Sequence, residues 1–176
     1  YADVIVVRHP EIGSANRAAE AAEAPVINAG DGAGQHPTQA LLDLYTLKSE
    51  HGSLDGLRLA LCGDLLNGRT VHSGVELYQL FNIELTFVSP PTLKMPKEII
   101  TKLKKNNISI EETDSLEYGL RKADALYMTR IQKERFEDLS EYAKVKDSYV
   151  LSRELVEENN PTIKILHPLP RVNELD

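Results

Sequence analysis

The sequence predicts an α/β protein in which parallel sheets are flanked by helices and the chain forms two lobes. Short apolar runs alternate with helical segments along the chain, which is the order that βαβ units require. The runs are almost continuously apolar, as expected for strands that are buried on both faces. A polar joint near residues 50–56 interrupts the alternation. We therefore expect one lobe over residues 1–50 and a second over residues 51–176.

The first lobe is expected to contain two strands and two helices. Residues 2–7 are interpreted as a short buried strand, and residues 14–24 as a helix because they are rich in alanine. Val26 and Ile27 make a second short strand. Pro37 suits the first turn of a helix that runs to about Glu50, and five apolar side chains are expected to anchor it: Leu41, Leu42, Leu44, Tyr45 and Leu47.

The second lobe continues the alternation. Apolar runs predict strands or short extended pieces at residues 57–62, 83–88, 108–111, 125–128, 149–151 and 162–166. Helices are expected between them, at residues 70–81, 97–106, 115–123 and 153–159. The helix at 97–106 is basic and should lie on the surface, and Ser115 is suited to cap the one that follows.

Composition excludes several classes of partner. The 176 residues carry a net charge of −7, which argues against general binding to nucleic acid or to an anionic membrane. No apolar run approaches the ~20 residues that span a bilayer, and the first residues lack the features of a signal peptide, so a cytoplasmic location is expected. Cys62 is the single cysteine, cannot form an internal disulfide, and is expected to be a buried small hydrophobe.

A glycine-rich turn leads directly into the helix that begins at Pro37. Glycines 30, 32 and 34 would let the backbone approach a ligand closely. The helix N-terminus that follows, near His36 and Gln39, offers unpaired N–H groups and partial positive charge to an anion. The pattern also fits a simple tight turn, and both interpretations stay open at this point.

Arginines follow the apolar strands at similar positions, and these are Arg8, Arg69, Arg130 and Arg171. In an open α/β sheet the carboxyl edge of the strands is where ligands bind. The planar guanidinium matches carboxylate and phosphate groups bidentately, so we expect an anion-binding cleft. Surface ion pairs, contributing about 0–1 kcal/mol each, are the alternative, but they have no reason to recur at strand ends.

The other polar residues divide into two groups. His36, Gln39, Thr70 and Gln132 belong with the expected cleft, whereas His9, His51 and His72 are interpreted as structural or exposed. Residues 63–70 differ from a nucleotide-binding P-loop in that Arg69 replaces the lysine, and Asp64 would repel a triphosphate. Residues 30–34 match a dinucleotide fingerprint only weakly, because His36 and Pro37 stand where the third glycine is sought. No metal cluster or cofactor motif is present.

Five segments together resemble the catalytic chains of the aspartate carbamoyltransferases, at residues 6–10, 28–39, 63–73, 127–136 and 167–174. They occur in the family's order across the whole chain. The resemblance implies transfer of a carbamoyl group from carbamoyl phosphate to L-aspartate in pyrimidine biosynthesis, without metal or cofactor. It also implies a homotrimer, sometimes bound to regulatory chains.

The resemblance implies roles for individual residues. Arg8, His36 and Gln39 would contact carbamoyl phosphate, with Arg8 and His36 also catalytic. Arg69 and Arg130 would hold the carboxylates of aspartate, with Gln132 nearby. The main-chain carbonyls of Leu169 and Pro170 would meet the carbamoyl nitrogen, across a bond that is typically cis in the family.

The match covers the middle of the family's chain. The family's phosphate-gripping Ser-Thr-Arg-Thr segment, its lysine loop and its closing helix have no counterpart in these residues, and Leu66 stands where lysine is common. We thus expect the end of a carbamoyl-phosphate domain plus most of an aspartate domain, with exposed apolar surface that favours association. The alternatives are a non-catalytic binding fragment and an ornithine carbamoyltransferase, whose cationic acceptor would not suit Arg69 and Arg130.

Overall fold

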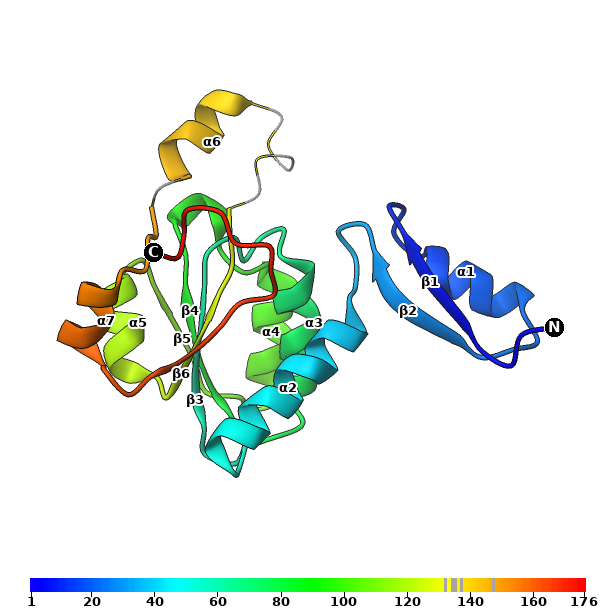
Figure 1. Cartoon of the computed structure of the whole chain (residues 1–176), viewed down its shortest axis with the longest axis horizontal. Coiled ribbons are helices and arrows are strands. Elements are labelled where there is room, and N and C mark those ends of the chain that lie inside the picture. Colours follow the sequence, from blue (N-terminus) through cyan, green and yellow to red (C-terminus); the bar gives the residue numbers. More distant parts are fainter. Residues whose placement is uncertain (132, 134–135, 137, 147) are drawn as a thin grey trace.

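The computed structural model describes residues 1–131, 133, 136, 138–146 and 148–176. Figure 1 shows a small lobe at the N-terminal end and a larger lobe that contains the rest of the chain. Every strand pairing in the described residues is parallel. The predicted α/β class with parallel sheets and flanking helices is therefore confirmed.

The small lobe is a two-stranded sheet covered by one helix. Strands β1 (Ile5–His9) and β2 (Val26–Asp31) pair in parallel, and helix α1 (Ser14–Ala21) packs on them. Because α1 covers one face only, Val6 and Ile27 remain 63% and 42% exposed. The expectation of a buried first strand was wrong for this reason. Strand β2 also runs four residues beyond the predicted Val26–Ile27 pair, into the glycine-rich turn.

The large lobe is a five-stranded sheet in the order β5-β4-β3-β6-β7. Its strands are β3 (Arg58–Cys62), β4 (Glu84–Val88), β5 (Ile110–Thr113), β6 (Ala125–Met128) and β7 (Lys164–Leu166). From the central β3 the chain builds outwards through β4 to β5, then returns to the other side of β3 with β6. The order therefore reverses between β3 and β6, and ligands of such sheets bind at the carboxyl ends of the strands at this switch point.

Helices cover both faces of the large sheet (Figure 1). Helices α2 (Pro37–His51), α3 (Arg69–Tyr78) and α4 (Lys97–Lys105) lie on one face, and α5 (Leu116–Lys122) and α7 (Arg153–Asn159) on the other. Alternate residues of β3 enter separate cores: Leu59 and Leu61 pack with the α2–α4 face, Ala60 and Cys62 with the α5 face. Burial on both faces explains the continuously apolar strands of the sequence.

Helix α2 runs from the glycine-rich turn onto the large lobe and contacts both β2 and α3. Its buried residues are Ala40, Asp43 and Leu47, spaced so that they share one helix face. Leu41, Leu42 and Tyr45 are 56%, 58% and 73% exposed. The expectation that all five apolar residues anchor this helix was therefore wrong, because three of them point away from the large lobe.

The remaining differences concern short elements. The extended piece predicted at 108–111 is displaced to β5 (Ile110–Thr113), and the one predicted at 149–151 forms a single bridge between Leu151 and Leu175. Helix α6 (Leu139–Val145) and the short 3₁₀ helix η1 (Pro91–Leu93) were not predicted. Within the described residues, none of the helices has the length and apolar character needed to cross a bilayer.

Candidate active site

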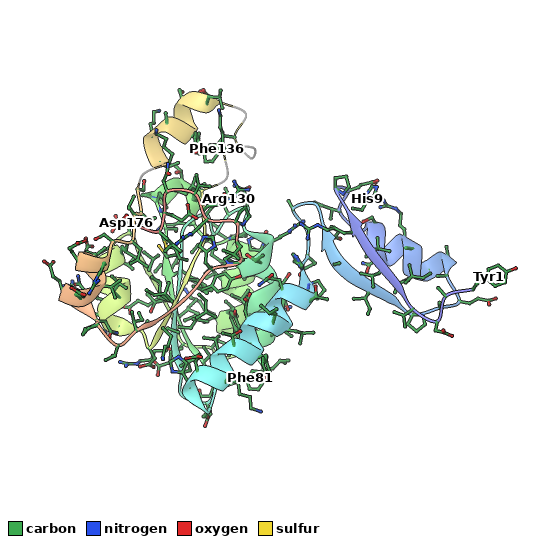
Figure 2. The ribbon with its side chains drawn as sticks, viewed as in Figure 1. Tyr1, His9, Phe81, Arg130, Phe136 and Asp176 are labelled. Carbon is green, nitrogen blue, oxygen red and sulfur yellow. The ribbon has the colours of Figure 1, made fainter. Side chains whose placement is uncertain are left out.

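A cleft of about 250 Å³ opens at the carboxyl edge of the large sheet, at the switch point. Its lining residues come from β1, from the turn before α3 and the start of α3, from the loop after β6, and from the segment after β7: Arg8, Gly68, Arg69, Thr70, Thr129, Arg130, His167, Pro168, Leu169 and Pro170. Figure 2 shows Arg130 at this edge of the large lobe, on the side from which the chain continues towards α6. Residues far apart in the sequence thus meet in one small polar depression.

Three of the four predicted arginines meet in this cleft. Arg8, Arg69 and Arg130 line it, whereas Arg171 is exposed and lines a separate depression with Leu151 and other residues. The prediction that all four arginines converge in one cleft was therefore wrong. Arg171 comes five residues after β7 ends at Leu166, and over that length the chain turns its side chain away from the edge.

Arg69 is held against the glycine-rich turn of the small lobe. It is the first residue of α3, and its Nη1 donates to the main-chain oxygen of Gly32 at 2.7 Å. Gly30 has a positive φ of 116°, and a Cβ atom there would lie 3.3 Å from the guanidinium carbon of Arg69. The glycine at position 30 thus makes room for one of the protein's own guanidinium groups and joins the two lobes at the cleft.

The ends of β3 and β6 approach each other closely through Gly63. Its φ is 120°, and a Cβ atom there would lie 2.2 Å from the main-chain oxygen of Thr129. The N–H and hydroxyl groups of Thr129 both donate to the oxygen of Cys62, at 2.8 and 2.9 Å. This contact brings the loops that carry Arg69 and Arg130 to the same cleft.

His36 stands at the N-cap of α2 beside two arginines. Its ring Nε2 lies 3.5 Å from Nη1 of Arg8. Burial lowers the pKa of His36, and the positive charges of Arg69 and Arg8 lower it further. The imidazole is therefore neutral at pH 7 and lies next to an array of cationic donors.

The position of the His36 backbone is fixed by a residue that the sequence analysis did not single out. The His36 N–H group donates to the hydroxyl of Ser73 at 2.8 Å, and that hydroxyl donates to Oε1 of Gln35 at 2.6 Å. Ser73 is buried in α3, so this bridge ties the large lobe to the start of α2. A serine inside a helix carries no signal of such a role.

Gln39 lies one turn further along α2 and is not among the residues that line the cleft. Its Nε2 donates to Oδ1 of Asp43 at 2.9 Å. The other carboxylate oxygen of Asp43 accepts from the hydroxyl of Tyr127 at 2.7 Å. Burial raises the pKa of Asp43, while both hydrogen bonds act in the opposite direction.

The segment after β7 is shaped by a buried histidine. The Nδ1 atom of His167 accepts from the N–H group of Leu169, and its Nε2 lies against the carboxylate of Glu174, both at 2.8 Å. Glu174 also accepts from the N–H groups of Val172 and Asn173. The Leu169–Pro170 bond is cis, as the resemblance implied, and Leu169 has a positive φ of 58°. Glu174 was not predicted to take part.

Roles were also expected from the sequence for Gln132, Cys62 and Asp64. Gln132 lies outside the described residues. Cys62 is buried, and burial raises its pKa. Asp64 is buried and accepts from the backbone and side chain of Asn67, so its carboxylate is bonded within the 63–70 loop.

The remaining histidines lie outside the cleft, as expected. His9 is exposed, and the ring of His72 contacts the main-chain oxygen of Leu65 at 2.8 Å. His51 is partly buried, and its Nε2 has no hydrogen-bond partner in the structure.

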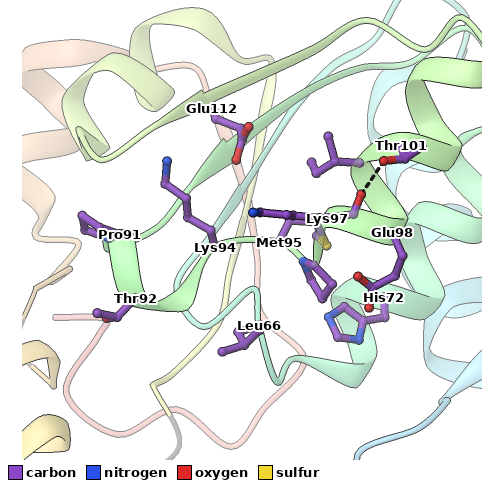
Figure 3. Close-up of a pocket in the computed structure, with 12 residues that line it drawn as sticks. Leu66, His72, Pro91, Thr92, Lys94, Met95, Lys97, Glu98, Thr101 and Glu112 are labelled. Atoms are coloured by element: carbon purple, nitrogen blue, oxygen red, sulfur yellow. Dashed lines mark hydrogen bonds between the residues drawn. The ribbon is translucent and has the colours of Figure 1, made fainter.

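A larger depression of about 940 Å³ lies between η1, α3 and α4 (Figure 3). Leu66 and His72 are on one side of it, and Lys94 and Glu112 on another. Its lysine and glutamate side chains are exposed, so they remain solvated rather than held in fixed positions. The smaller cleft, with three arginines from both lobes, is the better candidate for an active site.

Two family models match this chain. The carbamoyl-P binding domain of aspartate/ornithine carbamoyltransferase matches residues 1–49, and the Asp/Orn binding domain matches residues 55–176. The chain belongs to the aspartate/ornithine carbamoyltransferase family. The resemblance found in the sequence is thereby confirmed.

Individual carbamoyltransferases are similar over the whole chain. The aspartate carbamoyltransferase catalytic subunit of Thermococcus gammatolerans is 53% identical over 175 residues, which are 99% of this chain and 57% of that protein. The catalytic subunit of M. jannaschii aspartate transcarbamoylase superposes with a TM-score of 0.89 at 55% identity, covering 100% of this chain and 57% of the other.

A more distant relative was solved with ligands. The Trypanosoma cruzi aspartate transcarbamoylase, in complex with carbamoyl phosphate and aspartate, is 37% identical with a TM-score of 0.88, again over 100% and 57% of the two chains. The chain thus spans 57% of the length of these carbamoyltransferases.

Proposed function

We propose that this chain forms the larger part of an aspartate carbamoyltransferase active site, which transfers the carbamoyl group of carbamoyl phosphate to the amine of L-aspartate. The products are N-carbamoyl-L-aspartate and phosphate. The observation that carries the proposal is the cleft in which Arg8, Arg69 and Arg130 meet. Family membership and the names of the relatives support it.

Residues in and around the cleft have individual roles under this proposal. Arg8 and His36 bind carbamoyl phosphate and act in catalysis, and Gln39 contacts the same substrate. The main-chain carbonyls of Leu169 and Pro170 accept from the carbamoyl –NH2 group. Arg69 and Arg130 hold the two carboxylates of aspartate, and Gln132 is proposed to bind the same substrate.

The chemistry needs positioning and charge stabilisation. The neutral amine of aspartate attacks the carbamoyl carbon, and negative charge builds on its oxygen in the tetrahedral state. Arg8 and the neutral His36 are donors that stabilise this charge. The C–O bond to phosphate then breaks with its electron pair leaving on phosphate, and the attacking nitrogen loses a proton. Two arginines on a dicarboxylate fix the direction of the amine.

The same geometry favours aspartate over ornithine as acceptor. Aspartate presents two carboxylates, which suit two guanidinium groups in bidentate geometry. The side-chain ammonium of ornithine would lie among like charges in a cleft lined by three arginines, and like-charge contact is unfavourable. The similar proteins named above are aspartate enzymes.

We place the chain in pyrimidine biosynthesis, in the cytoplasm, and in a homotrimer that can associate with regulatory chains. Residues 1–50 would belong to a carbamoyl-phosphate domain and residues 51–176 to an aspartate domain. The description of the relatives as catalytic subunits supports an assembly of this kind.

The direct test is an assay of carbamoyl-aspartate formation by the purified chain, with carbamoyl phosphate and either L-aspartate or L-ornithine. Turnover with aspartate alone is the expected result, and turnover with ornithine alone would overturn the choice of acceptor. Calorimetry on the same sample measures binding of each substrate. Binding without turnover would identify the chain as a ligand-binding fragment. This is the second candidate function, and the chain's coverage of 57% of the relatives' length favours it.

A further inference from the structure

We infer that Asp43 is a positioning residue that holds the Gln39 carboxamide in one orientation, with its carbonyl oxygen available to a carbamoyl –NH2 group. The inference rests on the proposed function, in which Gln39 contacts carbamoyl phosphate. It assigns to a buried carboxylate on α2 a part in distinguishing a carbamoyl group from other acyl groups.

The contacts of Asp43 are specific and buried. The residue is 3% exposed and lies one helical turn after Gln39. Its Oδ1 accepts from Nε2 of Gln39 at 2.9 Å, and its Oδ2 accepts from the hydroxyl of Tyr127 at 2.7 Å. Burying a carboxylate without hydrogen-bond partners would cost several kcal/mol. Asp43 therefore needs both hydrogen bonds to remain buried.

A carboxylate fixes the orientation of an amide because it only accepts hydrogen bonds. The –NH2 end of Gln39 must therefore face Asp43, and its Oε1 must face away. An unrestrained glutamine could present either end to a substrate. Held in this way, Gln39 presents an acceptor, which a carbamoyl –NH2 group satisfies and a methyl group leaves unpaired. Unpaired polar groups in a closed site are the strongest source of such discrimination.

The other partner of Asp43 links this orientation to the aspartate side of the cleft. Tyr127 is buried in β6, two residues before Thr129 of the cleft, and its hydroxyl also interacts with the side chain of Thr70. Thr70 follows Arg69 directly and lines the cleft. The chain Gln39–Asp43–Tyr127–Thr70 thus joins a proposed carbamoyl-phosphate residue to both loops that carry the aspartate arginines.

The test compares binding of carbamoyl phosphate with that of acetyl phosphate, which has a methyl group in place of –NH2. In Asp43→Asn the new amide can offer either an N–H donor or an oxygen to Gln39, so both orientations of Gln39 become possible. The measured quantity is the dissociation constant of acetyl phosphate divided by that of carbamoyl phosphate, both from calorimetry. We expect this ratio to fall about tenfold in Asp43→Asn, as for the loss of one hydrogen bond. Asp124→Asn, which alters the Arg58 ion pair outside the cleft, should leave the ratio unchanged.

Two further variants separate positioning from structural damage. Gln39→Ala removes the acceptor and should lower the same ratio. If Asp43 acts through Gln39, then Asp43→Asn will change the ratio no further in the Gln39→Ala background. Equal changes in both backgrounds would overturn the inference, and so would an unchanged ratio in Asp43→Asn alone. A partly unfolded variant loses affinity for both phosphates together, which does not change their ratio.

A ligand-free measurement keeps this inference distinct from the proposed function. In NMR spectra, the side-chain amide protons of Gln39 should exchange with solvent more slowly in the wild type than in Asp43→Asn. Equal exchange rates would overturn the positioning role. Absence of carbamoyl-phosphate binding by the wild type would instead overturn the proposed function, and with it the use of Gln39 as an acceptor.

Discussion

Single side chains in and beside the cleft are held by contacts with other parts of the chain. Arg69 donates to Gly32, and His36 is fixed through Ser73. Such supports keep charged groups in place before a substrate arrives, so less ordering is needed on binding.

Replacing Arg130 by alanine is expected to weaken aspartate binding by on the order of a hundredfold, because one carboxylate would lose its charged partner in a confined site. Arg69→Ala should act in the same direction. The measurement is the concentration of aspartate that half-saturates binding or turnover. Arg153→Ala is the matched control, since that arginine pairs with Glu157 on the surface of α7. Aspartate dependence that survives both cleft substitutions would refute the assignment.

Because of His167, the free energy of unfolding is expected to depend on pH. Burial lowers its pKa, despite the opposing influence of Glu174. The unfolded chain, with an ordinary histidine pKa of about 6.5, therefore takes up a proton before the folded chain does. Stability rises with pH wherever the unfolded state binds more protons, so the contribution of His167 is lost as pH falls below about 6.5.

The measurement is denaturant unfolding of the wild type and of His167→Gln between pH 7.5 and about 5.5, values chosen around the ordinary histidine pKa. The wild type should lose more stability than the variant as the pH falls. His36 has the same direction of shift and is present in both proteins, so it cancels in the comparison. Parallel curves would show that His167 does not titrate in this way.

The sequence identified the charged residues of the cleft better than their supports. Arg8, Arg69 and Arg130 were predicted from their places after apolar strands, because the parallel arrangement decides where such residues meet. Ser73, Asp43 and Glu174 were not predicted. Their roles depend on partners 37, 84 and 7 residues away in the sequence, and no local pattern records which partner a buried polar group will find.

At the level of elements, the ends of β3 and β6 approach each other closely at Gly63. Gly63→Ala would place a Cβ atom 2.2 Å from the oxygen of Thr129. Gly56 is the matched control, since its φ is also positive, at 77°, but nothing lies within 4 Å of a Cβ atom there.

We expect Gly56→Ala to cost about 1 kcal/mol from the left-handed backbone alone. Gly63→Ala should cost roughly 2–4 kcal/mol, because a steric term is added. Denaturant unfolding of both variants measures the difference. Equal losses would mean that the two strands can separate at their ends without cost.

Helix α2 shows why the orientation of an element is harder to predict than its existence. Its start at Pro37 and its end near residue 51 were predicted from capping signals. Its apolar residues, however, lie on more than one face of the helix, and the buried face contains Asp43. The buried face combines Leu47 with Asp43, whose carboxylate is satisfied by Tyr127 of a distant strand, so the spacing of leucines alone does not identify it.

The whole molecule exposes apolar side chains on the small sheet and on helix α2. Val6 and Ile27 of the small sheet and Leu41, Leu42 and Tyr45 of α2 are all more than 40% exposed. Surfaces of this kind mark sites of association. We predict that the purified chain self-associates, and that Leu42→Lys with Tyr45→Lys reduces association. Sedimentation velocity measures both, and a well-behaved monomer at high concentration would contradict the prediction.

The placement of β6 beside β3 has a consequence for the order of folding. The hydrogen bond from Thr129 to Cys62 joins residues 67 apart in the sequence, and the one from Tyr127 to Asp43 joins residues 84 apart. Closing such long loops costs entropy before any contact compensates for it, and non-local pairing slows folding. A ribosome must therefore synthesise β6 before the arginine cleft can exist, and the nascent chain up to β5 contains two of its three arginines without a site.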